Sequence, residues 1–344
     1  MKSFNFSDSL PVLGITSLLL CPVVHGCESL HCTDGDFTAA ETVPVKMTVH
    51  SKSDMQGRTL DMLIFTNDDF RYLECWQRTA LTESGEVSIA SMNGEKLLMA
   101  CSGTDSKGYK DWMWVSSLES LQDVWTELED ETAGLPVMSG SCVFRTRTTA
   151  NEMPSLTLKR VSSEVYLRSL RCDFKGKPYE GESLSDIQVY LTNVNASCRI
   201  WNDAGSASRI INQGRLVMED VARFKDSSLI LQRIEGDVGS IGVNTDIRLR
   251  CYPNAAHEEG PGTPFTRLVI QGVLDGEVWY WPIDINRDGD SPHEGISSNC
   301  IYTYDIVLTR KGSADPDTAI KTGTASITLE VEKWEEKEWY TVGF

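Results

Sequence analysis

Short segments in which apolar and polar residues alternate are the feature that most restricts the fold of this chain. Such period-two alternation is typical of a β-strand with one buried face. The first clear example alternates apolar side chains with Pro44, Lys46 and Thr48, and its apolar members are Val43, Val45, Met47 and Val49. Similar segments recur at 187–191, 247–251, 302–308 and 327–331. Because no regular strand–helix alternation occurs, the sequence predicts an all-β protein made of β-sandwiches.

Length and composition favour two folded domains. The chain has 344 residues and 40% hydrophobic residues, enough for packed cores. Polar residues 148–152 followed by Pro154 predict the boundary, with domains at 27–153 and 154–344. The formal net charge of −18 argues against binding to nucleic acid, because a strongly negative surface repels phosphate backbones.

Two local signals predict features besides single strands. Ser116 as N-cap and Glu119 in a capping box predict a helix that covers one side of a sheet. Its apolar residues on one face are Leu118, Leu121, Trp125 and Leu128. Asn93-Gly94, between two apolar segments, predicts a β-hairpin.

The N-terminus has the pattern of an export signal. Lys2 precedes the apolar segment Leu10–Val24, which is too short to span a bilayer comfortably. The sequence Val23–Cys27 is similar to a bacterial lipobox. We therefore predict a lipoprotein signal peptide at 1–26 and lipidation of Cys27, the first residue of the mature protein. Leu18–Cys21 is a weaker lipobox candidate, and an ordinary secretory signal beside a cysteine is the alternative to lipidation.

Residues typical of catalysis or cofactor binding are scarce. The chain contains no G-x-S-x-G, P-loop or H-E-x-x-H motif. Its ten cysteines include no C-x-x-C pair, and its five histidines do not cluster. We expect no enzyme activity, no cofactor and no zinc site. The cysteines outside the signal region could form disulfides in an exported protein or serve as small buried apolar groups.

One segment imitates the start of an EF-hand calcium loop through Asp284, Asn286, Asp288 and Asp290. Its twelfth position is Gly295, where calcium binding needs a carboxylate, and no helix pattern flanks it. We interpret the segment as a turn between strands and expect no metal there.

Two pairs of tryptophans stand at strand spacing: Trp112, Trp114, Trp279 and Trp281. Aromatic faces pack on sugar rings, so exposed tryptophans would indicate a glycan-binding platform. Residues two apart on a strand share one face of the sheet, and that face usually belongs to the core. We favour the core.

Four stretches occur in an order that resembles the fimbrillin family, the two-domain subunits and accessory proteins of type V fimbriae. The first is the lipobox followed by VPVKMTV and TLDMLIFTNDD; the second is GEKLLMACSGTD followed by the predicted helix and LPVMSG. The third is SLTLKRVSSEVYLRSL with DIQVYLTNVN; the fourth runs from WYWPIDINRDGD to ASITLEVEKW. Together they span nearly the whole mature chain.

The resemblance implies two tandem transthyretin-like β-sandwiches with one or a few short helices. It also implies a non-enzymatic role in a cell-surface fimbria, built with other fimbrial subunits. In that family a lipoprotein precursor crosses the outer membrane, and a trypsin-like protease removes its first strand. A strand from the C-terminal region of a neighbouring subunit then fills the groove by β-augmentation.

Carried over to this chain, the resemblance makes Val43, Val45, Met47 and Val49 the placeholder strand. Cleavage is expected after Arg58, with Lys52 as the second choice. Arg58 directly precedes the strand that begins at Thr59, which leaves a protease little exposed chain. This favours an accessory or anchor-like subunit held in the outer membrane by the lipid on Cys27.

The last twenty residues supply the expected donor strand. A break at Glu332-Lys333 separates Ile327–Val331, expected in the resident sandwich, from the segment expected to be donated. The candidate donor residues are Trp334, Tyr340, Val342 and Phe344. Stalk, tip and anchor positions in the fibre stay open. The alternative function is a surface lipoprotein adhesin that binds glycan or a host protein through exposed tryptophans.

Overall fold

The computed structural model describes residues 42–50, 58–82, 84–107, 112–147, 154–201, 209–287, 294–320, 323–334 and 339–343, the last range by its backbone alone. The predicted signal peptide and five residues named above lie outside this part of the chain: Cys27, Lys52, Asp288, Asp290 and Phe344.

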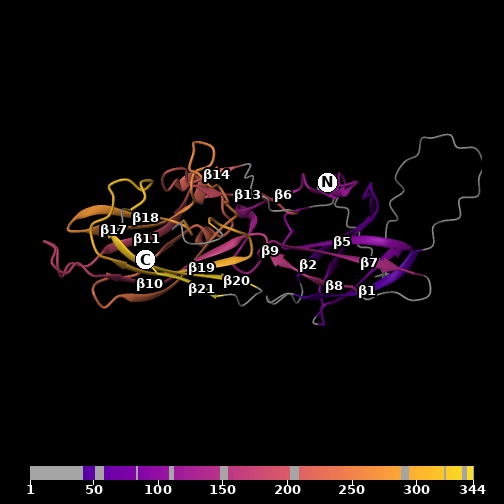
Figure 1. The fold of residues 1–344 in the computed structure, drawn as a ribbon, viewed down its shortest axis with the longest axis horizontal. Helices are drawn as coiled ribbons and strands as arrows, with labels where there is room; N and C mark the ends of the chain where they lie inside the picture. Colours follow the sequence, from indigo (N-terminus) through magenta and orange to yellow (C-terminus); the bar gives the residue numbers. More distant parts are fainter. Residues whose placement is uncertain are drawn as a thin grey trace, which may run out of the picture. The chain divides into compact units, whose positions relative to one another are not determined.

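The described chain is all-β, as predicted, and its first sheets form an N-terminal sandwich (Figure 1). One sheet has the order β4 (Glu86–Met92), β1 (Thr42–His50), β8 (Ser155–Thr157). The facing sheet has the order β3 (Leu73–Ala80), β2 (Thr59–Thr66), β5 (Gly94–Ser102), β7 (Met138–Thr146), β9 (Lys159–Arg160). Apolar side chains from both sheets pack in a common core.

Two larger sheets form a C-terminal sandwich. The five-stranded sheet has the order β16 (Val243–Cys251), β10 (Ser163–Cys172), β19 (Cys300–Leu308), β20 (Ala325–Lys333), β21 (Trp339–Gly343). The four-stranded sheet has the order β15 (Leu231–Arg233), β11 (Ser185–Thr192), β17 (Arg267–Leu274), β18 (Glu277–Asp284). The two sheets pack around residues such as Leu167, Ile270 and Tyr304.

The remaining elements are short. Two more strand pairs are β12 (Val194–Asn195) with β14 (Ile210–Ile211), and β13 (Ser197–Arg199) with β6 (Trp125–Glu127). The helices are α2 (Leu118–Leu121), α3 (Met218–Val221), η1 (Leu128–Asp130) and η2 (Ser227–Leu229). None of the helices in the described ranges is long and apolar enough to cross a membrane.

A segment of the N-terminal half joins the two sandwiches. Leu121, Leu128 and Val137 cover the outer face of β2 and β5, and they belong to the same apolar cluster as the C-terminal core. Strand β6 in this segment pairs with β13 of the C-terminal half. The two sandwiches are therefore joined by backbone pairing and by a continuous core.

The helix is much shorter than the helical spacing of its apolar residues predicted. Helix α2 contains four residues, and its capping box uses Ser117 and Ser120 instead of Ser116 and Glu119. Trp125 lies in β6, where backbone pairing with β13 prevents a helical continuation. Tertiary pairing thus overrides the local helical pattern.

The predicted hairpin at Asn93-Gly94 is wrong. Strands β4 and β5 lie in opposite sheets, because β4 pairs with β1 while β5 pairs with β2 and β7. Gly94 has a φ of +127°, and its carbonyl and that of Met92 both accept hydrogen bonds from the Thr146 hydroxyl. Asn93 and Gly94 lie where the chain crosses from one sheet to the other. The prediction failed because turn residues do not specify which strands pair with each other.

Strands β8 and β9 lie after the predicted domain boundary, yet they pair with N-terminal strands. β8 pairs with β1 in parallel, and β9 pairs with β7. The chain enters the C-terminal sandwich between Arg160 and Ser163.

Candidate functional site

The predicted placeholder strand, β1, lies between two other strands. It pairs with β4 in antiparallel fashion from Thr42 to Thr48, and with β8 in parallel at its end. The Val49 amide donates to the Gly85 carbonyl over 2.9 Å, and the Leu158 amide donates to the His50 carbonyl over 3.0 Å. Removing β1 would leave β4 and β8 with unpaired backbone edges.

The alternate side chains of β1 are buried, as the alternation predicted. Val45 and Met47 are 0% exposed and Val49 is 7% exposed, while Val43 is half-buried. They pack in the same core as Met62, Ile64 and other side chains of the facing sheet. Burying each side chain of this size contributes about 1.5–3 kcal/mol. Strand β1 therefore fills a groove whose walls are β4 and β8 and whose floor is apolar.

Arg58 is restrained at the start of β2. Its carbonyl accepts a hydrogen bond from the Leu81 amide over 2.9 Å, and its Nη2 donates to the Gly134 carbonyl over 2.6 Å. The side chain is half-buried. A trypsin-like protease must bind both the guanidinium and the backbone around this residue, so cleavage requires these contacts to open.

The two parts of the C-terminal segment differ in their positions. Strand β20 lies inside the sheet, paired with β19 along its whole length and with β21 on the other side. Its Leu329 is 1% exposed, and Ile327 and Val331 pack against the core. Strand β21 lies at the sheet edge and pairs only with β20 among the described strands. The part that can leave without opening the core is the part after Lys333.

Trp334, the first candidate donor residue, is held at the join between the sandwiches. The guanidinium of Arg160, in β9, lies over its ring. The Trp334 amide donates to the Asn299 carbonyl over 2.8 Å, and the Arg160 amide donates to Asn299 Oδ1 over 3.1 Å. Tyr340 and Val342 lie in β21, which is described by its backbone alone.

No family model matches the sequence, and no curated protein matches it. Solved structures do match its fold. A candidate cell adhesion protein from Bacteroides eggerthii superposes with a TM-score of 0.67 at 15% identity, covering 87% of this chain and 98% of that chain. A fimbrilin from Porphyromonas gingivalis gives 0.61 at 14% identity, covering 86% and 98%. The chain has the fimbrillin fold. The tip fimbrial protein Mfa3 from Porphyromonas gingivalis, solved with a C-terminal truncation, gives 0.51 at 12% identity, covering 85% and 100%.

Within this fimbrillin fold, the residues of the calcium-like segment serve other contacts. Asp284 accepts a hydrogen bond from Arg267 Nε over 2.7 Å, and its burial raises the pKa of its carboxyl. Asn286 has a φ of +51°, and its amide Nδ2 donates to the Gly295 carbonyl over 2.8 Å. Among the described residues, no group of three or more His, Cys, Asp or Glu side chains could hold a metal ion.

The four tryptophans do not form one platform. Trp112 and Trp281 are buried, at 2% and 0% exposed, and Trp281 Nε1 donates to the Arg310 carbonyl over 3.0 Å. Trp279 is half-buried against the core. Trp114, by contrast, is 77% exposed. The core interpretation is confirmed for Trp112 and Trp281 and is wrong for Trp114, because Trp114 lies on a turn and not on a strand.

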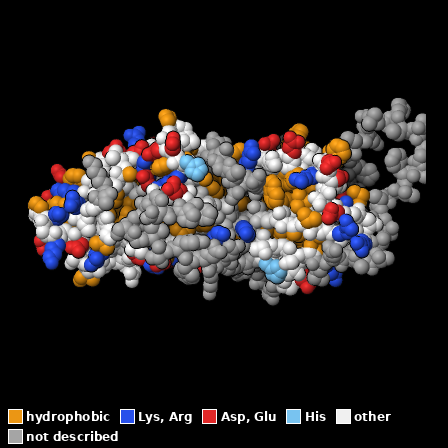
Figure 2. All heavy atoms as spheres, viewed as in Figure 1, with side chains coloured by type: hydrophobic (Ala, Val, Ile, Leu, Met, Phe, Trp, Pro, Cys, Tyr) orange, Lys and Arg blue, Asp and Glu red, His pale blue; other side chains and the backbone are white. Residues whose placement is uncertain are grey.

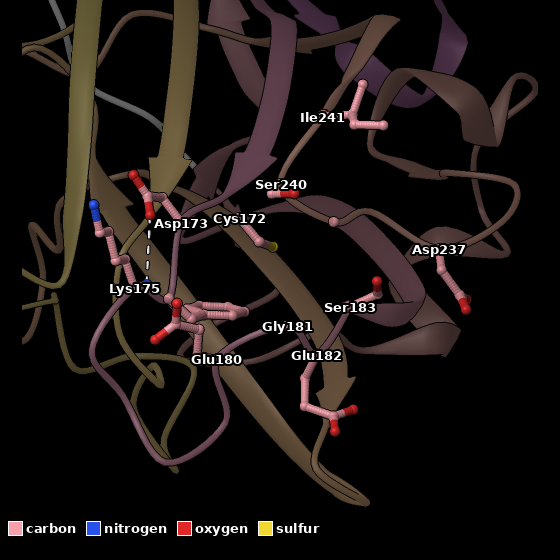
Figure 3. A pocket seen from close by; sticks show the side chains of 13 residues that line it. Cys172, Asp173, Lys175, Glu180, Gly181, Glu182, Ser183, Asp237, Ser240 and Ile241 are labelled. Carbon is pink, nitrogen blue, oxygen red and sulfur yellow. Dashed lines mark hydrogen bonds between the residues drawn. The ribbon is translucent and has the colours of Figure 1, made fainter.

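A cleft of about 720 Å³ lies at the end of β10. Its lining includes Asp173, Glu180, Glu182 and Asp237. Figure 3 shows that these carboxylates point in different directions and do not converge on a common point. Acidic and basic side chains are also interspersed on the face seen in Figure 2, so the negative charge is not gathered into one patch there.

Sequence reasoning missed a buried polar cluster between the sandwiches. Glu131, which is 1% exposed, accepts hydrogen bonds from Tyr252 Oη over 2.9 Å and Ser162 Oγ over 3.1 Å. Arg250 Nη1 lies 3.5 Å from Glu131 Oε2 and donates to the Thr132 carbonyl over 2.9 Å. Glu131 and Arg250 are far apart in the sequence and each sits among ordinary polar residues. No local signal could have paired them.

Proposed function

We propose that the protein is a non-enzymatic subunit of a cell-surface fimbria that accepts a neighbour's strand in place of β1. The observation that carries the proposal is the position of β1. It is a central strand that closes a sandwich, yet it is the first strand of the described chain, and Arg58 follows the connection to β2. A first strand can leave without unthreading the rest of the chain.

Solved proteins with this fold support the proposal, because some of them are described as fimbrial proteins. They include a fimbrilin and a tip fimbrial protein. Other fimbrial subunits are the proposed partners. The proposed location is the outer membrane surface, where lipid on Cys27 would hold the subunit until cleavage after Arg58 removes the lipid together with β1.

The proposed exchange follows β-augmentation. An incoming strand would pair its backbone with β4 and β8 and place alternate side chains in the pockets that Val45, Met47 and Val49 occupy. The tail offers three apolar residues at the same spacing: Tyr340, Val342 and Phe344. Backbone hydrogen bonds would supply affinity, and the pocketed side chains would supply register.

The proposed donor is the segment after Lys333. Strand β20 pairs with β19 from Cys300–Lys333 to Leu308–Ala325, so it belongs to the resident sheet. Removal of residues 325–344 should therefore unfold the C-terminal sandwich. Removal of residues 335–344 should leave a folded subunit that accepts a strand but cannot donate one.

The restraint on Arg58 favours an anchor-like or accessory subunit within this function. Its carbonyl and its guanidinium are both hydrogen-bonded, to Leu81 and to Gly134. A subunit that is cut slowly would keep β1 and its lipid longer than the subunits that form the fibre.

Mass spectrometry of surface protein tests the proposal. A mature N-terminus at Thr59, together with ladders of polymer on gels, supports strand acceptance. Lipid on Cys27 with β1 retained would overturn strand acceptance and would leave an anchor that only donates. Arg58→Ala and Lys52→Ala variants, alone and together, identify the cleavage site, and Arg71→Ala is the control because Arg71 is exposed in another turn.

Incubation of cleaved subunits with the chain lacking 335–344 separates the two roles. The shortened chain should cap polymers at one end and form no polymer alone. Polymerisation of the shortened chain at the rate of the full chain would overturn donation by this segment.

A further inference from the structure

Strand β4 pairs with β1 and with no other strand of the described chain. Its residues Glu86–Met92 lie opposite residues 42–48 of β1. When β1 leaves, as proposed above, β4 loses its only ladder of backbone hydrogen bonds to a strand. The groove keeps this wall for an incoming strand only if other contacts hold β4 in position.

The backbone groups of β4 alternate between its two edges. Pro44 of β1 lies opposite Ala90 and has no N–H, so the odd-numbered residues of β4 are the ones that bond to β1. The even-numbered residues, among them Ser88 and Met92, therefore direct their amides and carbonyls away from β1. These groups form the outer edge of β4.

Side chains of β3 bond to the middle of this outer edge. Gln77 Nε2 donates to the Ser88 carbonyl over 3.2 Å. Cys75 Sγ donates to the Ala90 carbonyl over 3.3 Å. Strand β3 lies in the facing sheet, so these bonds fasten β4 to a strand that stays in place when β1 leaves.

Two further side chains bond to the ends of the outer edge. The Met92 amide donates to Glu74 Oε1 over 2.6 Å, and the Thr82 hydroxyl donates to the Glu86 carbonyl over 3.1 Å. Glu74 is itself fixed by an ion pair with Lys96 at 2.5 Å, in which both side chains are 5% exposed. A hydrogen bond to a charged carboxylate is stronger than one between neutral groups. We call Glu74, Cys75, Gln77 and Thr82 the edge clamp.

A β-bulge allows Glu74 and Cys75 to reach β4 together. The partner of Ile64 in β2 is Cys75, but the partner of Phe65 is Leu73, which leaves Glu74 as the extra residue. Neighbouring residues of a regular strand point to opposite faces. A bulge redirects a side chain, and here it brings two adjacent residues to the same strand.

We infer that the edge clamp holds β4 in place when β1 leaves, so that the groove keeps this wall for the incoming strand. The inference rests on the proposed strand acceptance and assigns positioning residues to it. The edge clamp also occupies the outer edge of β4, so a new strand can pair with β4 only where β1 was. A wall that is already in place lowers the cost of ordering the groove on binding.

Native-state amide exchange of the uncleaved chain, followed residue by residue by NMR, tests the inference without any donor. Opening of β1 frees the amides of Val45 and Met47, which lie on the strand that leaves. The Met92 amide stays bonded to Glu74. After correction for intrinsic rates, the Met92 amide should therefore exchange at least about tenfold more slowly than those of Val45 and Met47.

The double variant Cys75→Ala/Gln77→Ala removes two contacts of the edge clamp. It should lose about tenfold of the protection of the Met92 amide, as expected for two neutral hydrogen bonds. Ser88→Ala is the matched control, because alanine keeps the backbone carbonyl to which Gln77 donates. Cys75→Ser should keep the wild-type protection, because its hydroxyl can donate to Ala90. Equal melting temperatures would show that the variants fold.

A labelled peptide with the sequence of residues 334–344 tests the consequence for strand acceptance in the chain cleaved after Arg58. The double variant should bind this peptide about tenfold more weakly than the wild type, equivalent to about 1.4 kcal/mol. Ser88→Ala should bind it as the wild type does.

The inference is overturned if the Met92 amide of the wild type exchanges as fast as those of Val45 and Met47, because β4 would then open together with β1. Wild-type protection of Met92 in the double variant, or an equal loss in Ser88→Ala, would also overturn it. A cleaved wild type that binds no peptide would instead overturn the proposed strand acceptance, while the exchange rates would still decide whether the edge clamp holds β4.

Discussion

The guanidinium carbon of Arg160 lies 3.4 Å from the centre of the Trp334 ring. Arg160 belongs to β9 of the N-terminal sandwich, and Trp334 directly follows β20 of the C-terminal sandwich. Both residues also hydrogen-bond to Asn299. Trp334, the last described residue before β21, the proposed donor strand, is thus fastened to the other sandwich.

Replacing Trp334 with alanine should loosen β21 without unfolding the sandwiches. A partly desolvated cation–π contact contributes about 1–2 kcal/mol. Amide hydrogen exchange across Trp339–Gly343 should therefore become roughly 5–30 times faster, as read by mass spectrometry. Trp114→Ala is the control and should leave that exchange unchanged. Equal exchange rates in Trp334→Ala and wild type would mean that the ring does not restrain the strand.

Met47→Ala should destabilise the uncleaved protein strongly. Met47 is 0% exposed in the centre of β1, and truncating such a side chain typically costs about 2–5 kcal/mol. Urea unfolding followed by circular dichroism measures the change. Lys46→Ala, on the exposed face of the same strand, should stay within about 0.5 kcal/mol of wild type. A small effect of Met47→Ala on the free energy of unfolding would show that the sandwich does not depend on β1 for its stability.

Glu131→Gln should change how stability depends on pH. Burial raises the pKa of Glu131 above its ordinary 4.5, despite the nearby Arg250. A carboxyl with a raised folded-state pKa contributes stability at low pH, and that contribution is lost as the pH rises through the folded pKa. Above pH 4.5 the wild type should therefore lose unfolding free energy relative to Glu131→Gln. Urea titrations from pH 3.5 upward measure the difference, and a constant difference would contradict the raised pKa.

The described cysteines should react slowly with alkylating reagents. All seven are free: Cys75, Cys101, Cys142, Cys172, Cys198, Cys251 and Cys300. Burial raises the pKa of Cys75 and of Cys251 to about 12, and that of Cys172 to about 11. Few thiolates therefore exist at pH 8. Iodoacetamide at pH 8 should label these residues only after denaturation, as counted by intact-mass spectrometry. Rapid labelling of the native protein would contradict this expectation.

Local alternation predicted the strands well because one face of each strand meets a core. The buried positions of β1 and β20 follow directly from Val45, Met47 and Leu329. Alternation does not identify the partner of a strand. It could not indicate that β8 completes the sheet of β1, or that Asn93-Gly94 crosses between sheets.

The sequence pattern also did not predict which aromatic side chains are exposed to solvent. Trp112 and Trp114 differ by two positions, yet one is buried and the other points to solvent, because they lie on a turn instead of a strand. Phe70 and Tyr72, which follow the turn-rich Thr66–Asp69, are also exposed, and no sequence pattern predicted this. The hydrogen bonds of Asp68 that display them are visible only in three dimensions.

The pairing of β6 with β13 has a mechanical consequence for a fibre. In the proposed fibre, a pull along a chain of exchanged subunits would enter at the groove of β1 and leave through β20 and β21. Between these points the load must cross from one sandwich to the other. It crosses a two-strand ladder, a shared apolar core and the buried contacts of Glu131. Each subunit would then transmit tension as one unit, because paired strands and a shared core, and not a flexible linker alone, connect its two sandwiches.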